Sequence, residues 1–396
     1  MGNLAEIYYD PYDYAIDADP YPVWKRMRDE APVYWNDRFR FYALTRFEDV
    51  LDASIDTDRY SSAHGSVLEL LDLPEEHVPR LMLFTDPPYH TQLRKLVSRG
   101  FTPRAIERLE QRVRALACQY LDAQAGRREF DLVQDFGAKL PMMVIGSMLG
   151  IPDERQDYFR ERFDQFLHRD EGETDFNLEL QHRVNRELAE IAFERRTHPR
   201  DDLMSVIVNG DLEEEGGARR KLTDREVAEM LGLIASAGNE TVARLVGWMG
   251  VLLDKHPDER RKLVEHPELI ADSVEEFLRY EPPSPVQARL LREEVTLHGT
   301  TMPRGAKVLL LTGAAGRDER EYPDPERFDV TRKVVRHVTF GIGPHYCLGA
   351  SLARLEGKVA LEELLKRYPR WEVDYDNAEP VHTSTVRGYQ RLPVRV

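Results

Sequence analysis

One of the two cysteines in this 396-residue chain, Cys347, lies in the stretch FGIGPHYCLGA near the carboxyl end. A lone cysteine is most often a small, buried packing residue. Its neighbours here need a further explanation, because glycines weaken any regular element and instead permit special dihedral angles or close approach of the backbone to another group. His345 also places a ring that can carry positive charge two residues before the thiol. The stretch therefore indicates a specialised loop around a thiol.

A second set of chemical groups lies at Ala237-Gly238-Asn239-Glu240-Thr241, in the middle of a long helical pattern. Glycine inside a helix costs about 1 kcal/mol relative to alanine. A threonine hydroxyl can donate to the carbonyl one turn earlier and open the helix locally. Together these residues could form a groove that holds a small polar ligand and supplies it with protons. The alternative is a kinked helix whose Asn239 and Glu240 face solvent, and the residues alone leave both interpretations open.

Two further pairs are spaced by one helical turn. Glu276 and Arg279 are three residues apart, which places them on one helical face as an ion pair. His90 and Arg94 follow two prolines and present two donors on one side, as an anionic ligand requires. Taken singly, such matches are more typical of an ordinary surface pair and of a solvated arginine.

The elements that position these groups are mostly helical. Thr102 and Pro103 predict the start of a helix that ends at Gly126. The longest helix is predicted to start at a capping box of Thr223 and Glu226 and to continue to Lys255, about 32 residues or roughly 48 Å. Further helices are predicted over residues 154–167, 178–196, 258–264, 268–280 and 348–367, and short strands over 294–298 and 307–311. We expect a mainly α single domain over residues 1–396 with a small β portion.

The composition narrows the class of function. The chain has 71 acidic and 55 basic residues, and a net charge of −16 argues against nucleic acid or an anionic membrane as the main partner. The first residues carry no leader or spanning segment, so we expect a cytoplasmic protein. The apolar run over 230–253 contains Asn239, Glu240 and Arg244, which favours a buried helix over a membrane span. Cys118 and Cys347 suggest neither a disulfide framework nor a zinc site, and Cys118 is interpreted as structural.

The four sets of residues described above occur together. Their order resembles that of the cytochrome P-450 family, the haem-thiolate monooxygenases, along essentially the whole chain. The Phe-Gly-x-Gly-x-His-x-Cys-x-Gly signature falls on residues 340–349, and the Ala-Gly-x-Glu-Thr centre falls on 237–241. The Glu-x-x-Arg pair falls on 276–279, and the His-x-x-x-Arg pair of the bacterial soluble members falls on 90–94. The resemblance implies the P-450 fold, with the long central helix crossing the domain over haem b.

The resemblance also implies roles for single residues. Cys347 would be the axial thiolate ligand of the haem iron, which favours O–O cleavage. Phe340 would pack beside the thiolate. Close approach to the cofactor would explain three glycines, namely Gly238, Gly341 and Gly349. Four cationic donors would hold the haem propionates, namely His90, Arg94, Arg289 and His345.

On the opposite side of the haem, the resemblance makes Thr241 the hydroxyl that steadies dioxygen, the co-substrate, and makes Glu240 part of the proton relay. Glu276 and Arg279 would form a structural ion-pair network completed by Arg327. The sequence departs from the family pattern at Val242, where many bacterial relatives carry a second hydroxyl, and at Glu319, where the usual Asn-Arg-Asp-Pro stretch ends differently.

Electrons must come from another protein, since no flavin or iron–sulfur motif is present. The resemblance implies a ferredoxin and a ferredoxin reductase, with electrons ultimately from NAD(P)H, acting on a monomeric enzyme. The expected dock lies at Arg332, Lys333 and Arg336, a basic cluster just before the cysteine loop that suits electrostatic steering. The alternative is an ordinary solvated charge run.

The expected substrate is a lipophilic small molecule such as a steroid, a terpenoid or a fatty acid, with a macrolide-type metabolite as the alternative. By analogy, its pocket lies between the loop 61–84, the long helix and two later segments. The expected lining residues are Leu233, Ile234, Ala237, Val286, Gln287, Ala288 and Thr385, with Gln287, Ser384 and Thr385 as orienting polar groups.

Three other functions are considered. A haem-thiolate sensor would need no proton relay, and a peroxide-driven hydroxylase tends to lack the acid–threonine pair that Glu240 and Thr241 provide. A thiol enzyme without haem would leave the other three sets of residues, at 237–241, 276–279 and 90–94, unexplained.

Overall fold

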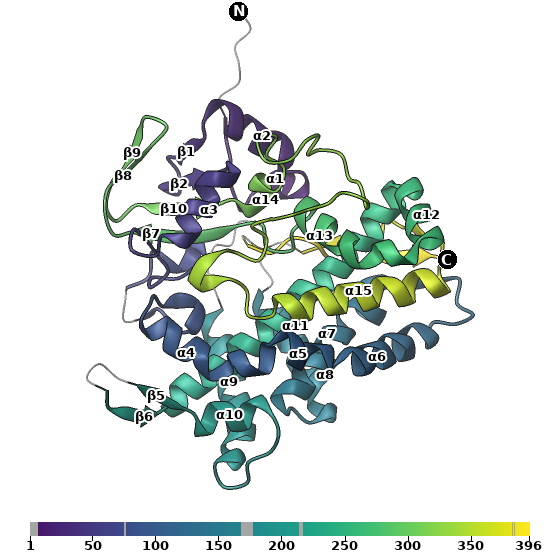
Figure 1. The fold of residues 1–396 in the computed structure, drawn as a ribbon, viewed down its shortest axis with the longest axis horizontal. Coiled ribbons are helices and arrows are strands. Elements are labelled where there is room, and N and C mark those ends of the chain that lie inside the picture. Colours follow the sequence, from purple (N-terminus) through teal and green to yellow (C-terminus); the bar gives the residue numbers. More distant parts are fainter. Residues whose placement is uncertain (1–6, 75–76, 168–176, 214–216, 382, 384) are drawn as a thin grey trace, which may run out of the picture.

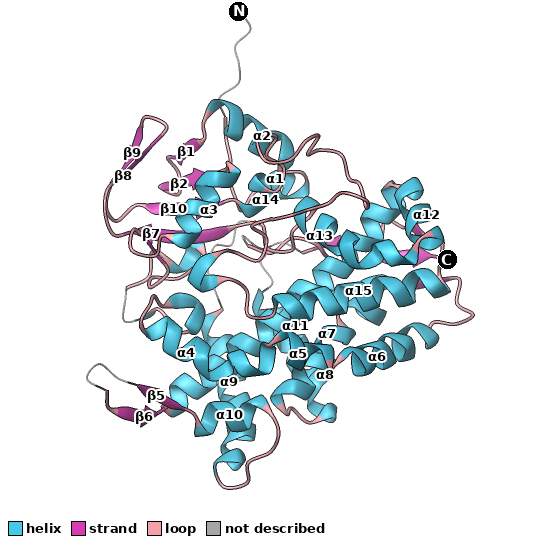
Figure 2. Cartoon of the chain, in the orientation of Figure 1, coloured by secondary structure: helices cyan, strands magenta, loops and turns pink. Residues whose placement is uncertain are grey.

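The computed structural model describes residues 7–74, 77–167, 177–213, 217–381, 383 and 385–396. Helices fill the lower and right-hand parts of the molecule, and the main sheet occupies the upper left (Figures 1 and 2). The α-helices are α1 (Tyr14–Ala18), α2 (Tyr21–Glu30), α3 (Phe47–Ile55), α4 (Tyr89–Val97), α5 (Pro103–Glu107), α6 (Glu110–Asp122), α7 (Lys139–Leu149), α8 (Asp153–Leu167), α9 (Leu178–Phe193), α10 (Leu203–Asn209), α11 (Asp224–Lys255), α12 (Pro257–Glu265), α13 (Ile270–Tyr280), α14 (Thr312–Ala315) and α15 (Ala350–Arg367).

The main sheet has five strands in the order β1-β2-β10-β7-β3. Strand β10 runs parallel to β2 and antiparallel to β7, so segments from both halves of the chain share one sheet. The strands are β1 (Val33–Asn36), β2 (Phe41–Leu44), β3 (Tyr60–Ser61), β4 (Glu129–Asp131), β5 (Asp211–Glu213), β6 (Arg219–Lys221), β7 (Gln287–Leu291), β8 (Val295–Leu297), β9 (Thr300–Met302), β10 (Lys307–Leu310), β11 (Glu372–Val373), β12 (Glu379–Pro380), β13 (Tyr389–Arg391) and β14 (Pro393–Arg395).

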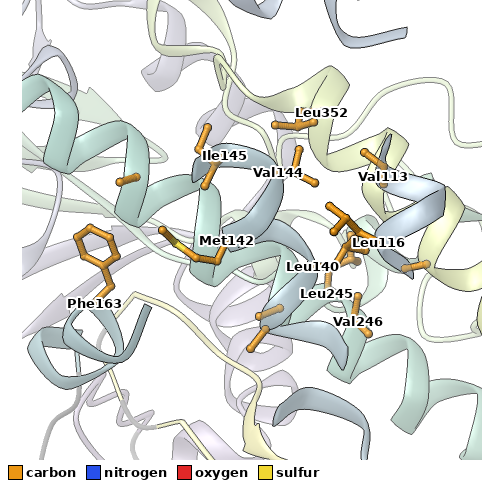
Figure 3. Packing of buried hydrophobic residues seen from close by; sticks show 14 of the residues in the cluster. Val113, Leu116, Leu140, Met142, Val144, Ile145, Phe163, Leu245, Val246 and Leu352 are labelled. Atoms are coloured by element: carbon orange, nitrogen blue, oxygen red, sulfur yellow. The ribbon is translucent and has the colours of Figure 1, made fainter. Parts of the chain in front are cut away.

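The long predicted helix is confirmed as α11, which spans 32 residues. Thr223 accepts the Glu226 N–H, and the Glu226 carboxylate accepts the Thr223 N–H, so the predicted capping box is present. Most of α11 is buried, and in the closely packed core its Leu245 and Val246 meet side chains of α6, α7 and α15 (Figure 3). Among the described residues, no helix is both long and apolar enough to cross a bilayer.

The continuous helix predicted from Thr102 to Gly126 is wrong in its middle. Thr102 does cap α5 by accepting the Ala105 N–H, but α5 ends at Glu107 and α6 starts at Glu110. The Leu109 N–H bonds the carbonyl only three residues back, at Ile106, which tightens the chain between the two helices. Ile106 of α5 and Val113 of α6 both reach the core, as their helical spacing predicts.

Candidate functional site

The Cys347 loop runs from Phe340 to Gly349 and leads directly into α15. The Cys347 N–H donates to the Phe340 carbonyl at 2.7 Å, which closes the loop on itself. Gly341 and Gly343 have φ values of +67° and +74°, a left-handed conformation that favours glycine. A Cβ added at Gly349 would meet no atom within 4 Å, so this glycine borders open space.

The surroundings of the Cys347 thiol shift its pKa in two opposite directions. Its side chain is exposed, yet the surrounding protein raises its pKa by burial. A hydrogen bond from the Gly349 backbone and the charges of Arg94 and Arg354 act in the opposite direction and favour the thiolate.

The four predicted propionate ligands lie together beside this thiol. The rings of His90 and His345 have centroids 4.3 Å apart, and His90 Nδ1 and His345 Nε2 are buried without a hydrogen-bond partner among the residues that the structure describes. Burial and neighbouring positive charge lower the pKa of His90 to about 4 and of His345 to about 3. Burial also lowers the pKa of Arg289 to about 10, and neither Arg94 nor Arg289 is ion-paired within the described residues.

This clustering of buried donors is costly unless an anion joins it. The nearby carboxylate of Asp86 is already bound to Ser61, to the Ser62 N–H and to Arg292. Two orphaned ring nitrogens and two unpaired guanidinium groups therefore fit an additional ligand that brings its own carboxylates, as the expected haem does.

Helix α11 contains Thr241 and Glu240, which are predicted to lie on the opposite side of the haem from Cys347. Ala237 is exposed and Thr241 half-exposed, although both lie in the middle of a helix that is otherwise largely buried. The Thr241 hydroxyl donates to the Ala237 carbonyl at 3.0 Å, the back-bond predicted from the sequence. Leu233 is half-buried, whereas Ile234 belongs to the buried core.

Two residues of this segment have different surroundings from those expected. A Cβ at Gly238 would come within 2.9 Å of Ile145, so this glycine allows α11 to pack closely against α7. Glu240 is buried and ion-paired with Arg244 at 3.1 Å, and Arg244 also donates to the Tyr389 carbonyl. The carboxylate expected in the proton relay is therefore held by a guanidinium group.

The Glu276–Arg279 pair is fully buried, with both side chains 0% exposed and two N–O contacts of 2.7 and 2.8 Å. Arg279 also donates to the Gly316 and Pro325 carbonyls. The side chain of Arg327 does not complete this network: it is 60% exposed and pairs with Asp329. Arg332 takes its place at 3.2 Å from Glu276, because the loop turns the Arg327 carbonyl inward and its side chain outward.

The basic cluster predicted as a docking surface is mostly neutralised. Arg332 is only 14% exposed and belongs to the buried network. Lys333 pairs with Asp272, and Arg336 pairs with both Glu48 and Glu321. This arrangement leaves little unpaired positive charge at the three positions.

The predicted substrate-pocket residues have mixed surroundings. Leu233 packs against a separate apolar cluster from the loop 61–84, formed by Leu70, Val78, Leu81 and Phe84. Val286 and Ala288 are buried in the core beneath the sheet, and the Gln287 amide oxygen accepts from Arg289. Thr385 is half-buried. Ser384 lies outside the described residues.

Sequence reasoning missed two charged residues beside the cysteine loop: Arg354 of α15, which contacts the loop, and Glu275 of α13, which binds Arg354. They bind each other at 2.6 and 2.9 Å, and Arg354 also reaches Tyr346. Each falls within an ordinary helical pattern, and 79 residues separate them. The only local signal is the position of Arg354, on the helix that follows Cys347.

Known proteins resemble this chain along nearly its whole length. The family model described as "Cytochrome P-450" matches residues 174–391. The "Putative cytochrome P-450 123" of Mycobacterium tuberculosis is 39% identical over 400 residues, covering 99% of this chain and 97% of that protein. The "Polyketide biosynthesis cytochrome P-450 PksS" of Bacillus subtilis is 35% identical over 410 residues, covering 99% of each. A solved structure of a mutant of P-450 EryK in complex with erythromycin B superposes with a TM-score of 0.87 and 33% identity, covering 96% of this chain and 97% of the other.

Proposed function

Because this chain belongs to the cytochrome P-450 family, it is a haem-thiolate monooxygenase, and we propose that it oxidises a lipophilic small molecule with electrons from a ferredoxin. The observation that carries the assignment of its residues is the group of four cationisable donors beside the Cys347 thiol, two buried and two half-buried, which have no carboxylate partner among the described residues. We further propose that it works as a cytoplasmic monomer.

The residues around the thiol prepare it for the cofactor. His90, Arg94, Arg289 and His345 would hold the two propionates, and Cys347 would bind the iron. When bound, the haem supplies O₂ activation, which places one oxygen atom in the substrate and reduces the other to water with two electrons and two protons. The Gly349 N–H and the Arg94 and Arg354 charges stabilise the thiolate form of Cys347.

We propose that Thr241 and Glu240 help to deliver the two protons that the reaction consumes. Since the Thr241 hydroxyl donates its own proton to the Ala237 carbonyl, its oxygen lone pairs remain free to accept a hydrogen bond from a water. Thr241 thus orients a water at the exposed face of α11. Glu240 lies beside it, and we propose that it delivers protons after its carboxylate exchanges Arg244 for water.

The apolar cluster over Leu233 supports a lipophilic substrate, and a mutant of the similar P-450 EryK was solved in complex with erythromycin B. An optical titration of the purified protein with steroids, terpenoids, fatty acids and macrolides tests the class. A compound that displaces water from ferric iron moves the Soret band to shorter wavelength, and a saturable shift with one class identifies the substrate family. Absence of a shift with every lipophilic class would contradict this part of the proposal.

The electron donor is proposed to dock on a different basic surface from the one expected. Five cations in the segment from α4 to α6, including its connecting turns, are exposed and form no ion pair within the described part of the chain, namely Lys95, Arg99, Arg104, Arg108 and Arg112. Helices α5 and α6 pack along α15, which starts at the cysteine loop (Figure 1). This unpaired charge in a chain of net −16 favours steering of an acidic ferredoxin to the cysteine side.

Charge reversal tests this dock. Arg104→Glu combined with Arg108→Glu should slow ferredoxin-supported reduction about tenfold at low salt and less at high salt. Arg304→Glu reverses another exposed arginine, in the turn before β10, and should leave the rate unchanged. Equal effects of the two changes would contradict the dock.

A further inference from the structure

One carboxylate, Glu275 of α13, holds two groups that flank the cysteine loop. Its oxygens lie 2.6 and 2.9 Å from the Arg354 guanidinium of α15 and 2.8 Å from His337 Nε2. Helices α13 and α15 pack against each other (Figure 1). The Glu275 carboxylate therefore connects both helices to the segment that leads into the cysteine loop.

The arm before the cysteine is fixed through His337. The Thr339 N–H donates to His337 Nδ1 at 3.2 Å, which makes Nδ1 the acceptor and places the ring proton on Nε2, where it donates to Glu275. The Thr339 hydroxyl donates to the Leu278 carbonyl of α13 at 2.8 Å. The segment that leads into the loop is therefore bound to α13 twice, through His337 and through Thr339.

The arm next to the cysteine is fixed through Arg354. Its Nη1 donates to the Tyr346 hydroxyl at 3.0 Å, and its guanidinium lies 4.6 Å from the centre of the Phe340 ring. Tyr346 precedes Cys347, and the Phe340 carbonyl accepts the Cys347 N–H. Arg354 thus touches both residues that set the position of the cysteine backbone, and its planar, multi-donor guanidinium makes these contacts together.

We propose that Glu275 and Arg354 are positioning residues that clamp the loop and hold Cys347 at the geometry needed for thiolate ligation. Neither residue belongs to the anion-binding group of His90, Arg94, Arg289 and His345, so the clamp is complete within the protein. It orients Cys347 through Phe340 and Tyr346, which is distinct from holding the propionates. The inference rests on the proposed role of Cys347.

The test uses the haem-loaded protein and the variants Glu275→Gln and Arg354→Lys. Each should speed hydrogen exchange of the Cys347 amide about tenfold, the factor expected from one lost charge-assisted hydrogen bond. Each should also raise the fraction of reduced, CO-bound protein with the spectrum of a thiol ligand in place of a thiolate. The double variant should be no worse than the more damaging single variant, since the two residues act as one unit.

Arg367→Lys is the matched control, because Arg367 is also on α15 and pairs with Asp122 and Glu363, away from the loop. It should leave both readouts unchanged. Wild-type exchange and a wild-type CO spectrum in Glu275→Gln and Arg354→Lys would overturn the clamp, as would an equal change in Arg367→Lys. If the unaltered protein itself lacked a thiolate spectrum, the proposed role of Cys347 would fail instead.

Discussion

Substitution of Glu276 by glutamine should destabilise the protein far more than its place in an ordinary helical pair suggests. The change keeps the size of the side chain but removes its charge, which leaves the Arg279 guanidinium fully buried without a counter-ion. Breaking a buried pair in this way costs about 3–5 kcal/mol, because the remaining charge stays desolvated. Arg332 and the Asp329 N–H also lose the charged acceptor that they share at Glu276 Oε1.

Urea unfolding of the haem-loaded protein, followed by far-ultraviolet circular dichroism, measures the cost. A matched control is Asp258→Asn, since Asp258 and Arg261 have the same three-residue spacing but are 77% and 64% exposed. That control should lower the free energy of unfolding by less than about 0.5 kcal/mol. A loss below about 1 kcal/mol for Glu276→Gln, or equal losses for the two variants, would refute the argument that burial decides the contribution of this pair.

Three other predictions concern the site and the core. Thr241→Ala should keep O₂ consumption but lower the product formed per NAD(P)H, because the hydroxyl that orients water is lost; unchanged coupling would contradict its role. Arg289→Gln should speed haem transfer to apomyoglobin about tenfold through loss of a charge-assisted hydrogen bond, and unchanged transfer would remove Arg289 from the propionate site. Burial raises the pKa of Glu356, whose two carboxyl oxygens have no partner within the described residues. Its proton stabilises the fold fully below the unfolded pKa of about 4.3, and this stability declines by up to about 1.4 kcal/mol per pH unit as pH rises toward the folded pKa. Glu356→Gln should therefore gain stability relative to the unaltered protein between pH 5 and pH 8 in urea unfolding, and parallel pH profiles would contradict a neutral Glu356.

Features set by local rules were predictable from the sequence. The capping box of Thr223 and Glu226 fixed the start of α11, and the Thr241 back-bond followed from its position four residues after Ala237. The glycines around Cys347 indicated special backbone, and two of them have positive φ. Each of these depends on residues within about one turn of each other.

Features that depend on tertiary packing were not predictable. The break between α5 and α6 interrupts a helical pattern that continues across it, since Ile106 and Val113 on either side both reach the core. The choice of Arg332 over Arg327 depends on which way a loop turns, since both arginines follow Glu276 by more than 50 residues. Long-range pairs such as these carry no spacing rule in the sequence.

The central claim is that Cys347 provides the thiolate ligand of a haem. The most direct test is the absorption spectrum of the reduced, CO-bound protein, compared between the unaltered chain, Cys347→Ser and the matched change Cys118→Ser at the other cysteine. We predict a thiolate-type Soret band in the unaltered protein and in Cys118→Ser, and its loss in Cys347→Ser. A thiolate-type band that survives in Cys347→Ser would contradict the assignment.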